Sequence, residues 1–223
     1  MDFRIISIGT LSHHPLWNEG QPVRVPHATT TLIRSGDRTI LVDPALPEQV
    51  LAARLNERSG LKPEAVTDIF LTSFRPTHRG GLRLFDHARW WISEAERETI
   101  GVDLVRKLSE ETDEETQQLL QQEIAILQAT KAAEDKFAEH VDLFPLPGYS
   151  VGTCGLLLAL PASTVIVAGD AVPTVEHFER GQVLQGAYDV KLARESMAEV
   201  IEIADWVIPG HDNLIPNATR RGI

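Results

Sequence analysis

The chain has 223 residues, a formal net charge of −11 at pH 7 and one cysteine. This length suits one large layered domain, and 43% hydrophobic with 24% charged residues is ordinary for a packed globular protein. The negative charge opposes binding to nucleic acid or to anionic membranes, because both are gripped through Lys and Arg surfaces. Cys154 cannot form an internal disulfide, and we interpret it as an inert core residue.

No segment of the sequence predicts membrane insertion or export. The longest apolar runs, such as GLLLALP and TVIVAG, are too short to cross a bilayer. The N-terminal MDFRIISIG lacks the apolar stretch that a signal peptide requires. Together with the unpaired cysteine, these features favour a cytoplasmic location and no membrane partner.

The first third of the chain predicts a sheet followed by a helix. Apolar residues from Phe3 to Ile8 indicate one strand, and residues 28–34 and 39–42 are rich in β-branched side chains. The turn Ser35-Gly36-Asp37 joins the latter two into a hairpin. A helix is expected over residues 48–58, and a short buried strand over residues 68–72.

A long helical segment is expected from about residue 93 to residue 140. It has no proline, no glycine after Gly101, and apolar residues at helical spacing. A break is expected near Gly101 or around Thr112 and Asp113, and the acidic run EETDEET is interpreted as a solvated helix start.

The last third returns to strands. Residues 156–160 and 164–168 are strand-like, a helix is expected over residues 191–204, and residues 206–208 form a short strand before Pro-Gly-His. The repeated order of sheet and then helix predicts a single α/β domain over residues 1–223, built as a four-layer αββα sandwich.

Five fragments place polar residues around or directly after these apolar strands. They are TTLIRSGDRTILVDPALP, LTSFRPTHRGG, PGYSVGTCGLL, VAGDAVP and VIPGHDN. In that order, and over nearly the whole chain, they resemble the metallo-β-lactamase fold superfamily. The resemblance implies the αββα fold and hydrolysis at a site for one or two metal ions.

The resemblance also indicates which ligand positions this chain keeps. The family set is a His-x-His-x-Asp-His loop, a His after a Pro-Gly step, an Asp in Gly-Asp and a His in Pro-Gly-His. Three positions match it: His78, Asp170 and His211. Four positions are degenerate, because other residues stand at them: Ser73, Arg75, Thr77 and Tyr149. One of the two family metal positions has therefore lost all three of its own ligands, and the other has lost one.

Three readings of the remaining residues stay open, and one of them is a two-metal site rebuilt with other ligands. Two histidines and a carboxylate suffice for one Zn²⁺ or Fe²⁺, which would act as a Lewis acid and lower the pKa of a bound water to about 7. Alternatively the pocket holds no metal. In that case Arg75 pairs bidentately with Asp170, and Tyr149 donates its hydroxyl to the same cluster.

Other polar residues are candidates for the surroundings of the site. His13 and His14 lie in a long loop after the first strand, and His27 precedes the second; we expect one of His13 and His14 to line the cleft. Asp43, in LVDP, matches a structural position of the family. It is expected to brace the loop at His78 without touching substrate.

The first functional hypothesis is a hydrolase of a small ester, lactone, thioester or amide. His78, Asp170 and His211 would hold the ion. Arg75 would bind a substrate carboxylate or stabilise a developing oxyanion, and Tyr149 would donate a hydrogen bond or shuttle a proton.

The second hypothesis is a catalytically inactive, metal-free family member that binds a ligand or another protein. Arg75, Arg79 and Tyr149 would then bind a small anion, while the acidic helix and the Trp90-Trp91 pair would serve an interface. Strand packing is the alternative expectation for the two tryptophans. Under both hypotheses the ligand is a small molecule, with an anionic one suggested by Arg75, and a homo-oligomer remains an open alternative.

Overall fold

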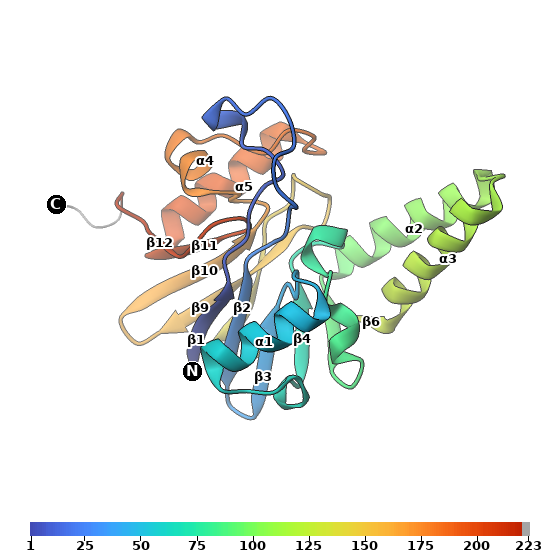
Figure 1. Ribbon diagram of the computed structural model, residues 1–223. Helices are drawn as coiled ribbons and strands as arrows, with labels where there is room; N and C mark the ends of the chain where they lie inside the picture. The colour runs from blue at the N-terminus through green and yellow to red at the C-terminus, as the bar shows by residue number, and fades with distance from the viewer. Residues whose placement is uncertain (220–223) are drawn as a thin grey trace.

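The computed structural model describes residues 1–219, in which two six-stranded sheets pack face to face between helices (Figure 1). The first sheet has the strand order β1-β2-β3-β4-β5-β6, with bounds Asp2–Ser7, Thr30–Ser35, Arg38–Val42, Asp68–Leu71, Arg89–Ile92 and Thr130–Ala132. The second has the order β12-β11-β10-β9-β8-β7, with bounds Ile215–Pro216, Trp206–Pro209, Ser163–Gly169, Cys154–Leu160, Val141–Pro145 and Lys136–Ala138. The predicted four-layer αββα sandwich is confirmed.

The five α-helices of the described residues cover the outer faces of the two sheets. They are α1 (Glu48–Ser59), α2 (Glu94–Glu110), α3 (Glu114–Ala129), α4 (Val175–Arg180) and α5 (Val190–Ile203). Apolar residues of α1, α2 and α3 pack on the first sheet, and those of α4 and α5 pack on the second. Within residues 1–219, no helix combines the length and the hydropathy needed to cross a bilayer.

Strand side chains alternate between two packing layers, as the pleat requires. In β4, Ile69 and Leu71 face the helices, whereas Phe70 faces the opposite sheet. In β10, Val167 lies between the sheets and Ile166 packs towards α5. Successive residues of each strand therefore pack alternately in the central core between the sheets and in an outer core beneath the helices.

Cys154 and the tryptophan pair serve this packing. Cys154 lies in the core between the sheets, where burial raises the pKa of its thiol to about 12, so the thiol remains protonated. The indole of Trp90 donates to the carbonyl of Phe85 at 2.9 Å, and that of Trp91 donates to Asp68 at 2.8 Å. Both tryptophans are half-buried strand residues, as the packing alternative expects.

The helical segment expected over residues 93–140 is wrong at its C-terminal end. α2 and α3 are separated by residues 111–113, where Asp113 caps α3, and Gly101 lies within α2. Residues 130–132 and 136–138 instead form β6 and β7, the edge strands of the two sheets. Their Lys and Ala residues favour a helix locally, but pairing with β5 and β8 overrides that preference.

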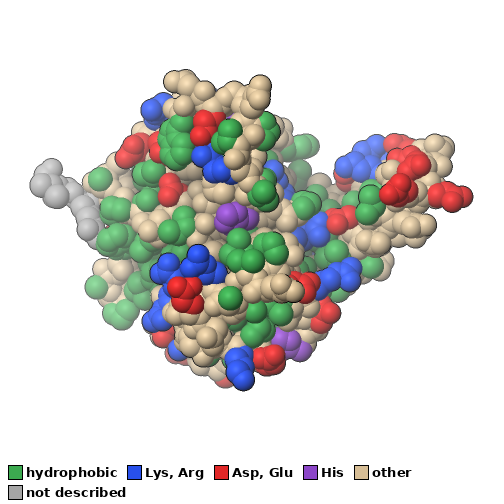
Figure 2. All heavy atoms as spheres, viewed as in Figure 1, with side chains coloured by type: hydrophobic (Ala, Val, Ile, Leu, Met, Phe, Trp, Pro, Cys, Tyr) green, Lys and Arg blue, Asp and Glu red, His purple; other side chains and the backbone are tan. Residues whose placement is uncertain are grey.

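The α2–α3 hairpin projects from the body of the molecule (Figure 1). Acidic side chains gather towards its far end (Figure 2), where α2 ends and α3 begins in Glu110, Glu111, Asp113, Glu114 and Glu115. The acidic run thus lies in solvent at a helix start, as its composition predicts.

A buried carboxylate, Asp68, stabilises the first sheet at the start of β4. It accepts hydrogen bonds from Arg38 at 3.0 and 2.8 Å, from Arg89 at 3.0 Å and from the indole of Trp91 at 2.8 Å. Burial alone would raise the pKa of Asp68. The hydrogen bonds from Arg38, Thr67 and Trp91 outweigh burial and lower the pKa to about 2.

We expect Asp68 to make the stability of the fold fall in acid. Its pKa is about 2 in the folded protein and about 4 in the unfolded chain, so its contribution is complete above pH 4 and is lost as the pH falls towards 2. The full contribution is about 2 kcal/mol, of which about 1 kcal/mol should be lost by pH 3. Urea unfolding of the wild type and of Asp68→Asn from pH 7 to pH 3 should show the stability gap narrowing. A gap that stays constant with pH would contradict this account, and the exposed Asp86→Asn is the matched control.

Candidate functional site

Three strand ends meet at one end of the two sheets. β10 and β11 are parallel neighbours, so Asp170 and His211 leave the sheet side by side just beyond them. β4, in the other sheet, leads through a loop to His78 in a short 3₁₀ turn over Pro76–His78. All three side chains are buried.

Two glycines allow these strand ends to approach each other. Gly169 has a φ of +54°, and a Cβ there would lie 2.5 Å from Oγ1 of Thr72. A Cβ on Gly210 would lie 2.8 Å from the carbonyl carbon of Gly169. The Gly-Asp and Gly-His steps of the sequence are therefore required by backbone packing between the strands.

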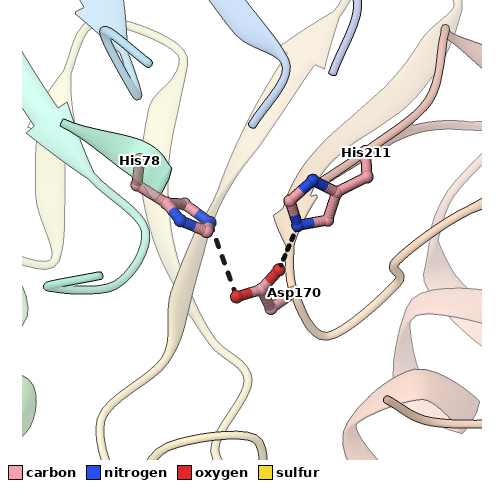
Figure 3. Close-up of side chains that lie close together, drawn as sticks. All are labelled: His78, Asp170 and His211. Carbon is pink, nitrogen blue, oxygen red and sulfur yellow. Dashed lines mark hydrogen bonds and ion pairs between the residues drawn. The ribbon is translucent and has the colours of Figure 1, made fainter. Parts of the chain in front are cut away.

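The side chains of His78, Asp170 and His211 point towards one another (Figure 3). Nε2 of His211 lies 2.9 Å from Oδ1 of Asp170, and Nε2 of His78 lies 3.6 Å from Oδ2. One possible ligand atom from each residue lies within 4.8 Å of the others. The Nε2 atom of His78 is buried and has no hydrogen-bond partner among residues 1–219. Two imidazoles and a carboxylate in this arrangement form a candidate site for one cation.

The local contacts set which nitrogen of each histidine is available. Nδ1 of His211 lies 3.0 Å from the backbone carbonyl oxygen of His27, which can only accept, so Nδ1 carries a proton. Nε2 faces Asp170 and donates to it only where His211 carries a second proton, whereas a bare Nε2 is free to bind a cation. Nδ1 of His78 lies 3.1 Å from the hydroxyl of Thr77. Burial lowers the pKa of His78 to about 4, so this imidazole is neutral at pH 7.

Arg75 contributes a permanent positive charge next to Asp170. Its Nη1 donates to Oδ2 of Asp170 at 2.7 Å. The bidentate pairing expected from the sequence is not formed, because the other carboxylate oxygen faces His211. Burial alone would raise the pKa of Asp170, but His78, His211 and Arg75 lower it well below its usual range, so Asp170 is ionised.

Tyr149 contacts Arg75 through the face of its ring. The guanidinium carbon lies 4.8 Å from the ring centroid, within the range of a cation–π interaction. Burial and the charge of Asp170 raise the pKa of Tyr149, so its hydroxyl keeps its proton and can donate. The preceding Gly148 has a φ of +128°, and a Cβ there would lie 2.1 Å from the amide nitrogen of Ala193. The loop that carries Tyr149 is thus packed directly on α5.

A cavity of about 160 Å³ opens over Arg75, Tyr149 and His211. This volume corresponds to about five water molecules, so it suits a small ligand or one end of a larger ligand. Arg75 supplies the permanent charge of the lining. The apolar part of the lining consists of Leu11, Pro15, Pro26 and Leu184.

The histidines expected near the cleft lie in three different environments. His13 is part of the cavity lining. His14 is buried elsewhere, with Nε2 3.1 Å from the hydroxyl of Thr174 and its ring stacked on Trp17 at 4.2 Å. The ring of His27 lies outside the cavity lining, because both of its nitrogens face backbone carbonyls. His27 nevertheless reaches the site through its own carbonyl, which orients His211.

Ser73, Thr77 and Asp43 lie around the triad. Ser73 is buried, and its hydroxyl has no hydrogen-bond partner within residues 1–219. Thr77 lines the cavity. Asp43, at a φ of +49°, accepts from the amide of Thr72 at 2.9 Å and from its hydroxyl at 2.7 Å. It therefore fixes the start of the loop that leads to His78.

Two charged residues near the motif have roles that the sequence did not indicate. Arg79 is buried, pairs with Glu123 of α3 and donates to the carbonyl of Phe74, so it does not line the cavity. The anion-binding role expected for Arg79 is therefore wrong. Glu96 of α2 is buried against the loops that carry Arg75 and Tyr149. A helix-start pattern around Ser93 was the signal available for Glu96, and it predicts a cap only.

Comparison with known proteins places this geometry in a family. The family model of the metallo-β-lactamase superfamily matches residues 23–211. No curated protein matches the chain.

Solved structures share the fold at low sequence identity. A metallo-β-lactamase candidate from Thermotoga maritima is 18% identical with a TM-score of 0.69, covering 96% of this chain and 98% of that one. AiiA from B. thuringiensis, a mutant with N-decanoyl-L-homoserine at its active site, is 21% identical with a TM-score of 0.66, covering 94% and 92%. AidC, a dizinc quorum-quenching lactonase in complex with the product N-hexanoyl-L-homoserine, is 18% identical with a TM-score of 0.61, covering 78% and 67%.

At these identities the structural likeness establishes the fold and not the substrate. The family model covers most of the chain, and the two packed sheets with their outer helices agree with it. The chain belongs to the metallo-β-lactamase superfamily.

Proposed function

We propose that this chain is a hydrolase that uses one divalent cation, Zn²⁺ or Fe²⁺, held by His78, Asp170 and His211. Its substrate would be a small ester, lactone, thioester or amide. The observation that carries the proposal is the convergence of these three donors around a buried Nε2 of His78 that has no hydrogen-bond partner among residues 1–219. Leaving such an atom unpaired costs about 1–3 kcal/mol, which ligation would recover. The cation would supply Lewis acidity at a carbonyl and acidify water.

The protein presents the three donors in the protonation states that ligation requires. The carbonyl of His27 keeps the proton of His211 on Nδ1, and burial keeps His78 neutral. Asp170 supplies the negative charge. The set therefore matches one divalent cation without first releasing a proton from His78.

Arg75 is proposed to limit the site to a single ion and to bind the substrate. Its guanidinium pairs with Asp170, and such a permanent cation repels a second metal ion. The Arg75 side chain is 38% exposed and lines the cavity, so its other donors are accessible. A substrate carboxylate or a developing oxyanion fits this position, and the protonated Tyr149 would donate a hydrogen bond beside it.

A metal-free ligand-binding protein is the second candidate. The observation that favours it is that both oxygens of Asp170 already face protein groups, Arg75 on one side and His211 on the other. In this candidate His211 carries a proton on both nitrogens and donates to Asp170. The buried charge is compensated in this arrangement without an ion. A small anionic ligand would then bind at the exposed face of Arg75.

The metal content of the protein decides between these candidates. Tag-free protein purified without chelator should contain about one zinc or iron per chain by plasma mass spectrometry, and His211→Ala should contain none because a ligand is lost. Hydrolysis of a lactone and ester panel should fall by about a hundredfold or more in the same variant. His87→Ala is the control, because His87 contacts the carbonyl of Val66 and not the site. Hydrolysis that His211→Ala leaves unchanged would refute the first candidate.

Replacing Arg75 should separate metal binding from ligand binding. Arg75→Gln removes a cation next to the ligands and frees one oxygen of Asp170, so zinc affinity should rise by about tenfold. The KM for a carboxylate-bearing substrate should rise, whereas that for its neutral amide should change little. Competition titration against a zinc indicator and steady-state kinetics measure the two effects. If Arg75→Gln and wild type bound zinc equally, Arg75 would have no electrostatic influence on the site.

A further inference from the structure

We infer that Glu96, a buried residue of α2, positions the Arg75–Tyr149 pair in the cleft; this inference rests on the proposed function of that pair. Glu96 is 1% exposed and touches neither the cavity nor the three candidate ligands. Its role would be exerted through the two loops that carry Arg75 and Tyr149.

The carboxylate of Glu96 connects these two loops. Its Oε1 accepts from the backbone amide of Phe74 at 3.1 Å, and Phe74 directly precedes Arg75. Its Oε2 accepts from the hydroxyl of Ser150 at 2.6 Å, and Ser150 directly follows Tyr149. The same oxygen accepts from the amide of Gly152 at 3.1 Å. One side chain thus sets the separation of two loops whose residues stack on each other 4.8 Å apart.

Glu96 departs from the usual role of a glutamate at this helix position. In a capping box, the glutamate three residues after the capping serine reaches back to the amide of that serine. Here the hydroxyl of Ser93 accepts from the amide of Glu96 at 3.2 Å and donates to the carbonyl of Gly152 at 2.5 Å, while the carboxylate turns towards the loops. The carboxylate of Glu96 accepts from three neutral donors and lies in the first turn of its own 17-residue helix.

The contact between α2 and the Tyr149 loop leaves no room for adjustment. A Cβ on Gly152 would lie 2.0 Å from the amide nitrogen of Glu96 and 2.4 Å from its Cα. The loop backbone therefore lies directly on the first turn of the helix, and the hydrogen bonds of Glu96 fix its height above that turn.

The Arg75 loop is held by both helices of the hairpin. The amide of Phe74 donates to Glu96 of α2, and the carbonyl of Phe74 accepts from Nε of Arg79 at 3.3 Å. Arg79 in turn pairs with Glu123 of α3. Both backbone groups of the residue before Arg75 are therefore held by the α2–α3 hairpin, Phe74 N–H directly and Phe74 C=O through Arg79.

The position of the Arg75 side chain can be followed by NMR. The ring of Tyr149 should shift the NMR signal of the Arg75 Nε–H, assigned through Arg75→Lys, away from the position of a free arginine. In Glu96→Ala that signal should move to the free position or broaden, and Glu96→Gln, which keeps one acceptor oxygen, should be intermediate. The control is Glu98→Gln, an exposed position two residues further along α2, and its Arg75 signal should match that of the wild type.

Two further readouts separate positioning from folding and from metal loss. The affinity of chelator-treated protein for hexanoate, measured by calorimetry with hexanamide as the neutral control, should fall by about tenfold in Glu96→Ala. Zinc content should stay at the wild-type value, because none of the contacts of Glu96 involves His78, Asp170 or His211.

The outcomes distinguish this inference from the proposed function. A cooperatively folded Glu96→Ala whose Arg75 signal equals that of the wild type overturns the inference; if that variant does not fold, an unchanged signal in Glu96→Gln does so. A wild-type protein without zinc or hydrolysis, whose Arg75 signal still responds to Glu96→Ala, refutes the hydrolase and supports the positioning role.

Discussion

The arrangement of the site depends on one buried charge, the carboxylate of Asp170. It stands at the end of β10 with no exposed surface, and an uncompensated carboxylate there would cost several kcal/mol. The Arg75 guanidinium compensates one oxygen, and Nε2 of His211 faces the other. These partners come together because the ends of β4, β10 and β11 meet, and Gly169 and Gly210 permit that close approach. A bound cation and the Arg75 guanidinium would therefore both compensate the buried negative charge of Asp170.

The elements that could be predicted from the sequence are those specified by local patterns. Apolar alternation and turn residues indicated the strands that precede His78, Asp170 and His211. The ends of the neighbouring strands β10 and β11 place Asp170 and His211 side by side, whereas His78 comes from β4 of the other sheet. The edge strands at residues 130–138 were missed, since their composition favours a helix and only pairing with distant strands makes them extended. The sequence could not indicate whether His13 or His14 lines the cavity, because the backbone conformation of the loop decides which of two adjacent side chains faces it. In the structure His13 lines the cavity and His14 contacts Thr174.

The contacts that orient the site residues could not be predicted from sequence patterns. The carbonyl of His27 fixes the tautomer of His211 across 184 residues of chain, and Glu96 joins loops 22 and 54 residues away. Such bonds involve backbone groups that every residue carries, so no residue type marks them. They nevertheless decide which nitrogen faces the candidate cation site and how Arg75 is held beside it. The hydrolysis proposed here is what membership of the family suggests, whereas the proposed single cation and the proposed anionic ligand rest on Arg75.

The most direct test of the single-cation site is anomalous diffraction at the zinc edge from crystals grown with equimolar zinc. One peak is expected, about 2.0–2.2 Å from Nε2 of His78, Nε2 of His211 and an oxygen of Asp170. Two peaks would show that Arg75 does not exclude a second ion. The absence of any peak, with Arg75 and His211 still bonded to Asp170, would contradict the metal site and leave the arginine as the only compensation for the buried carboxylate.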